Sequence, residues 1–203
     1  MAVSTARVEA MDAILDGAEA LLVEVGYSAI TTRKLAERAG VNHGLVHYYF
    51  GSMEEVFLQV LERYTAQLTA RQRTLYAGDA PFIEKWRVAM AHLVDDEELE
   101  YQKIWYELQA MAWSRPEMRA RVGRVLSEWQ DVLAPAFRDG LRELGVDTRS
   151  YPVDAIVSLV VTFNEGVILE RLMGVDSGHR QLLQMIDRML VRLDRAKAKG
   201  SVR

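Results

Sequence analysis

Apolar residues recur at spacings of three and four along nearly the whole chain, which predicts a protein built from helices. The first such stripe predicts a helix from about Thr5 to Val25, which Gly26 would end. Its apolar positions are Val8, Met11, Ile14, Leu15, Ala18, Leu21, Leu22 and Val25. We find neither the alternation typical of strands nor an internal repeat, so the fold class expected is all-α.

The segment Thr31–Phe50 (TTRKLAERAGVNHGLVHYYF) predicts two short helices joined by a tight turn. Thr31 and Asn42 stand at N-cap positions, and Gly40 occupies the place where a left-handed residue ends a helix. The outward positions of the second helix are largely aromatic: His43, Leu45, His47, Tyr48 and Tyr49. An ordinary helical hairpin would not need such a face, so the pattern favours a helix-turn-helix, whose second helix enters the DNA major groove.

The pattern predicts six more helices after this segment. A capping box at Ser52 and Glu55 begins a long helix that could reach Tyr76 and connect the DNA-binding segment to the remainder. Acidic residues at 95–98 mark a break, and Pro135 should kink the longest later helix near Asp131. The other predicted helices cover about residues 82–93, 101–112, 116–144, 152–173 and 177–196.

The last two predicted helices are apolar on more than one side, so each must be buried on more than one side. A central core helix in a monomer is one explanation, but for two terminal helices a second copy of the chain is the favoured partner. We therefore expect a homodimer with a four-helix interface. The interface residues expected are Ile156, Val160, Ile168, Leu172, Leu182, Met185 and Met189.

Composition narrows the class of protein further. Half of the 203 residues are hydrophobic, which suffices for one or two domains with a core. The chain has no cysteine, so disulfides, thiolate metal sites and cysteine nucleophiles are excluded. The N-terminus has no apolar signal region, and the longest apolar run, Ala155–Phe163, is too short to span a membrane. We expect a soluble cytoplasmic protein.

Charge is unevenly distributed along the N-terminal segment. The whole chain carries a net charge of −4, and residues 1–55 hold four basic and eight acidic residues. Thr31–Phe50 nevertheless carries about +2, from Arg33, Lys34 and Arg38 against Glu37. This narrow basic region predicts a shallower salt dependence than that of strongly basic DNA-binding proteins.

TTRKLAERAGV at Thr31–Val41, the helix Asn42–Phe50, Gly51-Ser52 and the acidic start of the next helix together resemble the TetR family of bacterial transcriptional regulators. The resemblance implies a three-helix DNA-binding domain over residues 1–51. It also implies a ligand-binding and dimerisation domain over residues 52–203, and about nine helices in all. The N-terminal motif covers about a quarter of the chain, whereas the remainder matches only in its helix pattern.

The resemblance also assigns expected contacts with double-stranded DNA. Thr32 and Arg33 would touch phosphate or a base, and Tyr49 would reach a phosphate. Residues expected to face the major groove are His43, Gly44, Leu45, His47 and Tyr48, and Asn42 completes the DNA-binding set. Met53 departs from the family pattern, because relatives commonly place a phosphate-binding lysine there. The backbone N–H groups at this helix start could still bind a phosphate.

Other groups of residues give weaker evidence for a functional site. His43 and His47 have the spacing of metal ligands, but no third ligand or general base lies near them in the sequence, so we expect neither a metal nor a cofactor. No nucleophilic triad, phosphate loop or carboxylate pair stands out, so we expect no enzyme. Trp86, Trp105, Trp113 and Trp129 suggest an aromatic interior that could equally be core or a ligand pocket. The ligand-binding residues expected are Tyr64, Trp86, Met90, Trp105, Met111, Trp129, Phe163 and Asn164.

The sequence therefore predicts a homodimeric, ligand-responsive DNA-binding regulator. The favoured form is a repressor that a small, mostly apolar or aromatic effector releases from a pseudo-palindromic operator. An activator or an effector-independent regulator of the same family remains the alternative. A helical adaptor that binds only proteins, or an all-α enzyme, fits the groove-facing residues less well.

Overall fold

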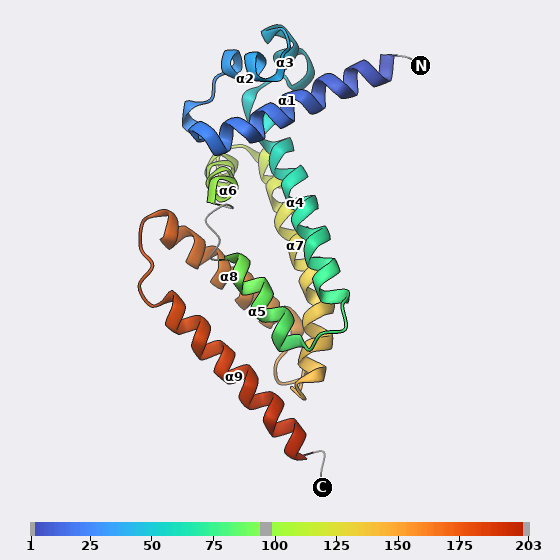
Figure 1. Cartoon of the computed structure of the whole chain (residues 1–203), viewed down its shortest axis with the longest axis vertical. Coiled ribbons are helices and arrows are strands. Elements are labelled where there is room, and N and C mark those ends of the chain that lie inside the picture. The colour runs from blue at the N-terminus through green and yellow to red at the C-terminus, as the bar shows by residue number, and fades with distance from the viewer. Residues whose placement is uncertain (1–2, 94–98, 201–203) are drawn as a thin grey trace. The chain divides into compact units, whose positions relative to one another are not determined.

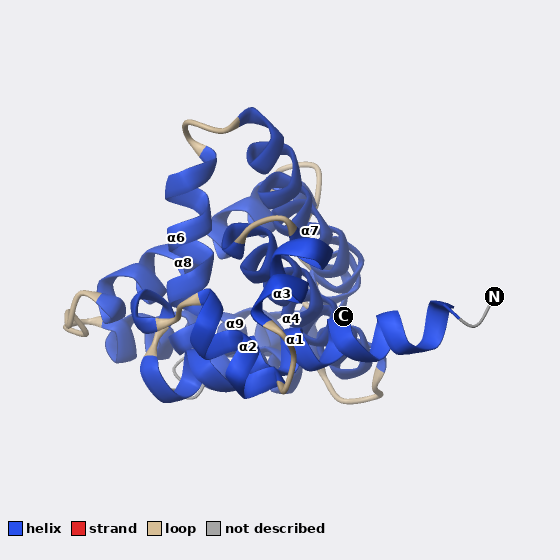
Figure 2. Cartoon of the chain, turned by 90° about the horizontal axis from the view of Figure 1, so that it is seen from above, coloured by secondary structure: helices blue, strands red, loops and turns tan. Residues whose placement is uncertain are grey.

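The computed structural model describes residues 3–93 and 99–200, and their regular structure is helical throughout (Figures 1 and 2). This confirms the all-α class. The described elements are α1 (Val3–Val25), the 3₁₀ turn η1 (Tyr27–Ala29), α2 (Thr32–Ala39), α3 (His43–Phe50), α4 (Met53–Ala77), α5 (Phe82–Leu93), α6 (Leu99–Ala112), α7 (Pro116–Glu143), α8 (Val153–Leu172) and α9 (His179–Gly200). None of the described helices is both long enough and apolar enough to cross a membrane.

The helix boundaries follow the capping signals closely. Gly26 and Gly145 take positive φ values of 73° and 71° at the ends of α1 and α7, as the helix-stop pattern predicts. Pro135 lies within α7, which runs from Pro116 to Glu143, and the kink near Asp131 stays a prediction. The predicted break at residues 95–98 lies outside the described residues.

The predicted stripe of α1 is too long at both ends. Its middle residues Ile14, Leu15, Ala18, Leu21 and Leu22 are buried, but Val8 and Val25 are 52% and 43% exposed. A periodic pattern identifies which face of a helix is apolar. Burial also needs a neighbouring element opposite each position, and Val8 and Val25 have no such neighbour among the described residues.

The chain divides into two compact units. The first comprises Met1–Gln67 and Glu97–Val125, and the second comprises Leu68–Asp96 and Leu126–Arg203. The first unit therefore contains α1–α3, the start of α4, α6 and the start of α7. These structural units do not coincide with the functional division at residue 51, which stays a prediction.

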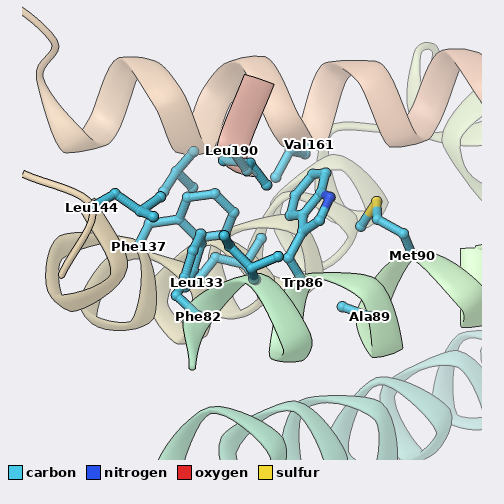
Figure 3. Close-up of a cluster of buried hydrophobic side chains, with 11 residues drawn as sticks. Phe82, Trp86, Ala89, Met90, Leu133, Phe137, Leu144, Val161 and Leu190 are labelled. Carbon is cyan, nitrogen blue, oxygen red and sulfur yellow. The ribbon is translucent and has the colours of Figure 1, made fainter. Parts of the chain in front are cut away.

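The second unit has an aromatic core in which α5, α7, α8 and α9 meet (Figure 3). The ring of Phe137 stands edge-on to those of Phe82 and Trp86, with centroid distances of 5.3 and 6.1 Å. Trp129 packs against this cluster. Trp113 does not belong to any interior, because its side chain is 76% exposed, and the expectation of four interior tryptophans is wrong at that position.

Polar contacts fix the helix ends of the second unit. The backbone N–H of Phe82, which starts α5, donates to Glu143 Oε1 at 3.0 Å. Lys197 Nζ donates to the carbonyl oxygen of Glu143 at 2.6 Å, so one residue of α7 joins α5 and α9. Such bonds satisfy backbone groups that a helix terminus leaves unpaired.

Candidate nucleic-acid interface

Three local interactions shape the helix-turn-helix. The hydroxyl of Thr31 accepts the backbone N–H of Lys34 at 3.2 Å, which caps α2. Gly40 takes the left-handed conformation with φ 66°, and the N–H of Val41 reaches back to the carbonyl of Ala36. Asn42 Oδ1 then accepts the N–H of Gly44 at 2.9 Å and caps α3. The predicted caps and turn are confirmed.

Buried apolar residues hold α2 and α3 against the rest of the first unit. Leu35 and Ala36 of α2 are buried, as are Val46 and Phe50 of α3. Gly17 of α1 lies against α2, and a Cβ at this position would lie 3.4 Å from the backbone nitrogen of Ala39, at van der Waals contact. These contacts determine which side of α3 faces outward.

The outward side of α3 carries the residues that the sequence singled out. His43, Gly44, His47 and Tyr48 are exposed, and Tyr48 is 77% exposed. Leu45 and Tyr49 are half-buried, and the rings of Tyr48 and Tyr49 meet edge-on at 5.2 Å. On α2, Arg33 is exposed and Thr32 is half-buried. The predicted contact residues are therefore accessible at least in part, while their individual roles at DNA stay predictions.

Fewer basic side chains are available to DNA than the three counted in Thr31–Phe50. The guanidinium of Arg38 forms an ion pair with Glu24 of α1. Lys34 Nζ donates to the backbone carbonyl of Ala29 at 2.9 Å, so its ammonium is turned toward η1. The side chain of Arg33 makes no ion pair or hydrogen bond with any part of the chain that the structure describes. A second cation, Arg7 of α1, lies with its Cζ atom 5.9 Å from the centroid of the Tyr49 ring.

The start of α4 is not an open phosphate site. The Ser52 hydroxyl accepts the N–H of Glu55 at 3.2 Å, which confirms half of the predicted capping box. Hydrogen bonds to its own backbone N–H and to the Ser52 hydroxyl hold the pKa of Glu54 below its usual range. Met53 adds no charge. Side-chain oxygens thus already engage N–H groups that a phosphate would use.

Comparisons with known proteins agree with this geometry. Residues 14–60 match the family model described as "Bacterial regulatory proteins, tetR family". The chain is 25% identical over 185 residues to the HTH-type transcriptional repressor AcnR of Corynebacterium efficiens, covering 89% of this chain and 92% of AcnR. The chain belongs to the TetR family.

Solved structures share the fold of this TetR-family chain over most of its length. A crystal structure of a TetR-family transcriptional regulator from Rhodococcus sp. aligns with a TM-score of 0.69 and 23% identity, covering 90% of this chain and 99% of the other. The regulator FadR from Bacillus subtilis, in complex with stearoyl-CoA, aligns with a TM-score of 0.65 and 18% identity, covering 89% and 95%. These relatives are transcriptional regulators, and this TetR-family protein is a regulator and not an enzyme.

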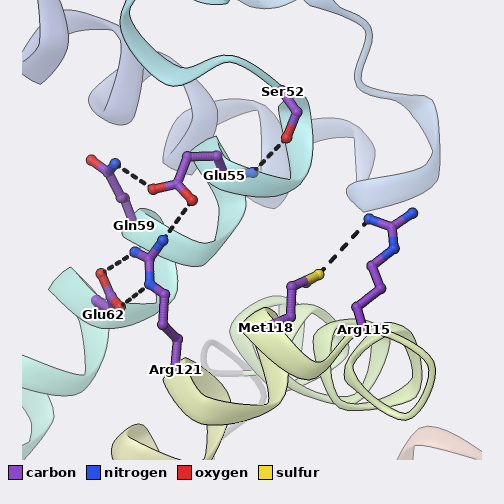
Figure 4. Close-up of polar contacts among 7 residues, drawn as sticks. All are labelled: Ser52, Glu55, Gln59, Glu62, Arg115, Met118 and Arg121. Atoms are coloured by element: carbon purple, nitrogen blue, oxygen red, sulfur yellow. Dashed lines mark hydrogen bonds and ion pairs between the residues drawn. The ribbon is translucent and has the colours of Figure 1, made fainter.

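In this TetR-family chain an ion-pair network joins α4 to α7 within the first unit (Figure 4). Arg121 of α7 donates to both carboxylate oxygens of Glu62, at 2.9 and 2.8 Å, and to Glu55 at 2.5 Å. Burial opposes ionisation of Glu55, but hydrogen bonds from Arg121 and Gln59 outweigh it, so the pKa of Glu55 lies below its usual value. Sequence patterns did not predict this network, because Arg121 and its partners lie far apart in the chain.

The residues predicted to bind a ligand are divided between the two units. Tyr64, Trp105 and Met111 lie in the first unit, where Tyr64 stacks on Tyr101 with ring centroids 4.1 Å apart. The second unit contains Trp86, Met90, Trp129, Phe163 and Asn164. Of these, Trp86 and Met90 line a groove of about 470 Å³ between α5 and α9. No group of three potential metal ligands occurs among the described residues.

The residues predicted at a dimer interface differ in exposure. On α9, Met185 and Met189 are each 55% exposed, whereas Leu182 is half-buried. On α8, Ile156 and Val160 pack against the aromatic core of their own chain. Also on α8, Ile168 is buried and Leu172 half-buried. The large apolar residues left exposed are instead Leu159 and Leu169 of α8 and Met173, which directly follows it.

Proposed function

We propose that this chain is a homodimeric repressor that binds a pseudo-palindromic operator and is released by a small, mostly apolar or aromatic effector. The observation that carries the DNA-binding part is the arrangement of α3. Val46 and Phe50 anchor its inner side, while His43, His47 and Tyr48 project outward. Because two recognition helices of a dimer read two half-sites, the half-sites should lie about one DNA turn apart. Like other DNA-binding regulators, the protein would act in the cytoplasm.

Exposed apolar residues on the last two helices support self-association. Leu159 of α8 and Met173, which directly follows this helix, fall on one side, and Gly166 lies between them on the same side, given 100° of rotation per residue. On α9, Met185 and Met189 form a second exposed patch. A second copy of the chain would bury both patches, and an isologous interface is the commonest way to do so.

The groove between α5 and α9 supports an effector site in the second unit. Trp86 and Met90 supply an apolar wall, and Leu183 lies opposite on α9. Its volume lies within the usual range for small-molecule sites. Met185 lies about 200° around α9 from Leu183, so the groove and the proposed dimer patch use different sides of that helix. FadR, which was crystallised with stearoyl-CoA, provides a precedent for a ligand with a long apolar chain on this fold.

Release from DNA requires the effector to prefer the conformation that fits the operator less well. A ligand with equal affinity for both conformations would leave DNA binding unchanged, however tightly it bound. The name of AcnR as a repressor favours repression over activation for this chain.

A gel-shift assay with the DNA upstream of the chain's own gene tests the DNA-binding part. Wild type should shift this DNA, and the His47→Ala and Tyr48→Ala variants should shift it less, while Arg138→Ala on the surface of α7 should match wild type. Failure of wild type to shift the DNA at any salt concentration would overturn the proposal. An adaptor that binds only proteins would give that result.

Sedimentation velocity tests the dimer. Leu159→Glu and Met185→Glu should convert a dimer into monomers, while Val88→Glu, which places the same charge on an exposed α5 position, should not.

Native mass spectrometry of the purified protein should detect a retained effector. Added effector should quench the tryptophan fluorescence and lower the gel shift, and a ligand that quenches without lowering the shift would refute its role as inducer.

A further inference from the structure

Helices α1, α2 and α3 leave few cations available for DNA. Within the described parts of α1, α2 and α3, Arg38 is neutralised by Glu24, and Lys34 is held by a backbone carbonyl. Arg33 and Arg7 are exposed and have no acidic partner among the described residues. The family resemblance assigns Arg33 to DNA but gives Arg7 no role.

Arg7 is fixed beside the recognition helix by an aromatic ring. Its guanidinium lies over the face of Tyr49, in the range of a cation–π contact. Tyr49 belongs to the last turn of α3, and its ring forms an edge-type contact with that of Tyr48. An aromatic face orients a guanidinium without cancelling its charge, whereas a carboxylate such as Glu24 cancels it. The N–H groups of Arg7 therefore remain available to an anion.

We propose that Arg7 is a DNA-phosphate contact, positioned by the ring of Tyr49, and that it supplies the anchor that Met53 cannot. This inference rests on the proposed DNA-binding function. In this arrangement Tyr49 acts through its ring, which differs from the family expectation that its hydroxyl reaches a phosphate. Because phosphates are common to all DNA, Arg7 contributes affinity without sequence preference.

The test is the salt dependence of binding to a fluorescein-labelled 40-base-pair duplex of mixed sequence, followed by fluorescence anisotropy. Removing one Arg7–phosphate interaction should reduce the slope of log K against log salt by about 0.9. Arg7→Ala should therefore weaken binding about eightfold at 0.1 M salt and about twofold at 0.5 M for each such interaction. Arg7→Lys should retain most of the slope, because it keeps the charge.

Variants at Tyr49 separate the ring from the hydroxyl. Tyr49→Phe keeps the aromatic face and should bind as wild type does, whereas Tyr49→Leu should lose part of the Arg7 contribution. In the Arg7→Ala background, Tyr49→Leu should have no further effect on the slope. A loss with Tyr49→Phe equal to that with Tyr49→Leu would refute the positioning role and favour a hydroxyl–phosphate contact.

Arg38→Ala is the matched control, because it removes an arginine of the same unit whose charge Glu24 already offsets. It should change the slope less than Arg7→Ala does. Equal slopes for wild type and Arg7→Ala would overturn the inference while leaving the proposed function standing. A wild-type protein that binds neither this duplex at low salt nor its upstream DNA would instead overturn the proposed function. Circular dichroism melting verifies that each variant still folds.

Discussion

Gly140 of α7 lies against the ring of Phe82, and replacing it by alanine should destabilise the second unit. A Cβ built at Gly140 would lie 2.1 Å from Phe82 Cδ2 and 2.4 Å from its Cγ. Ordinary carbon contacts begin near 3.5 Å, so the ring would have to move by about 1.5 Å. Phe82 is only 3% exposed, and its ring is packed against Phe137. It therefore cannot move aside without disturbing the aromatic core.

Two opposing effects determine the size of the change. Alanine in place of a helix-interior glycine stabilises a helix by about 1 kcal/mol. Overpacking a filled core costs about 1–3 kcal/mol, and a contact this short belongs at or beyond the upper end. We therefore expect Gly140→Ala to lower the free energy of unfolding by about 2 kcal/mol. For a protein of this length that corresponds to a fall of about 4–8 °C in Tm.

Gly123 provides the matched control on the same helix. A Cβ at Gly123 would meet no atom within 4 Å, so Gly123→Ala should show the helix effect alone. Thermal melting followed by circular dichroism should thus place Gly123→Ala about 2–4 °C above wild type. In a Phe82→Leu background, where the side chain is smaller and more flexible, the penalty of Gly140→Ala should shrink. An equal rise in Tm for Gly140→Ala and Gly123→Ala would refute the steric explanation.

The α4 network, the start of α4 and the dimer offer further tests. In wild type the lowered pKa of Glu55 gives stability that is present above about pH 4.5 and is lost as the pH falls through the folded-state pKa. In Arg121→Met, Glu55 stays buried but loses the guanidinium, so its pKa should rise. The Tm of this variant should therefore fall less than that of wild type on acidification from pH 5 to pH 3. Identical Tm–pH profiles for the two proteins would contradict this. Met53→Lys should tighten binding to any duplex and steepen the salt slope by about one unit, and an unchanged slope in anisotropy titrations would exclude a phosphate near this position. Gly166→Leu should leave the fold of one copy intact, because its Cβ position is open, but should weaken the dimer roughly ten- to hundredfold in sedimentation equilibrium. Gly123→Leu is its control, and an unchanged dimer constant would place Gly166 outside the interface.

Short-range signals explain what could be predicted correctly. Thr31, Gly40 and Asn42 act on backbone groups within five residues of themselves, so their presence in the sequence nearly specifies the caps and the turn. Periodicity likewise identified the helices and most of the buried face of α1. It failed at Val8 and Val25, because exposure depends on the cover that other elements provide.

Contacts between distant segments explain what could not be predicted. Net charge suggested three basic residues for the DNA face, but the pairing of Arg38 with Glu24 depends on how α1 crosses α2. On α8 the apolar residues go most of the way around the helix, so the sequence could not decide that Ile168 is buried and Leu159 exposed. The groove between α5 and α9 brings together residues about a hundred positions apart, among them Arg87 and Asp187.

The sequence by itself determined the helical class and the helix-turn-helix, because local capping and 3.6-residue periodicity encode them within short segments. The family was indicated by the resemblance of its motif at Thr31–Phe50. The tertiary structure alone decided which charges are neutralised, which apolar side of α8 remains uncovered, and that Arg7 lies over Tyr49. The physical reason is that burial and pairing are properties of two surfaces in contact. A single stretch of chain specifies only one of those surfaces.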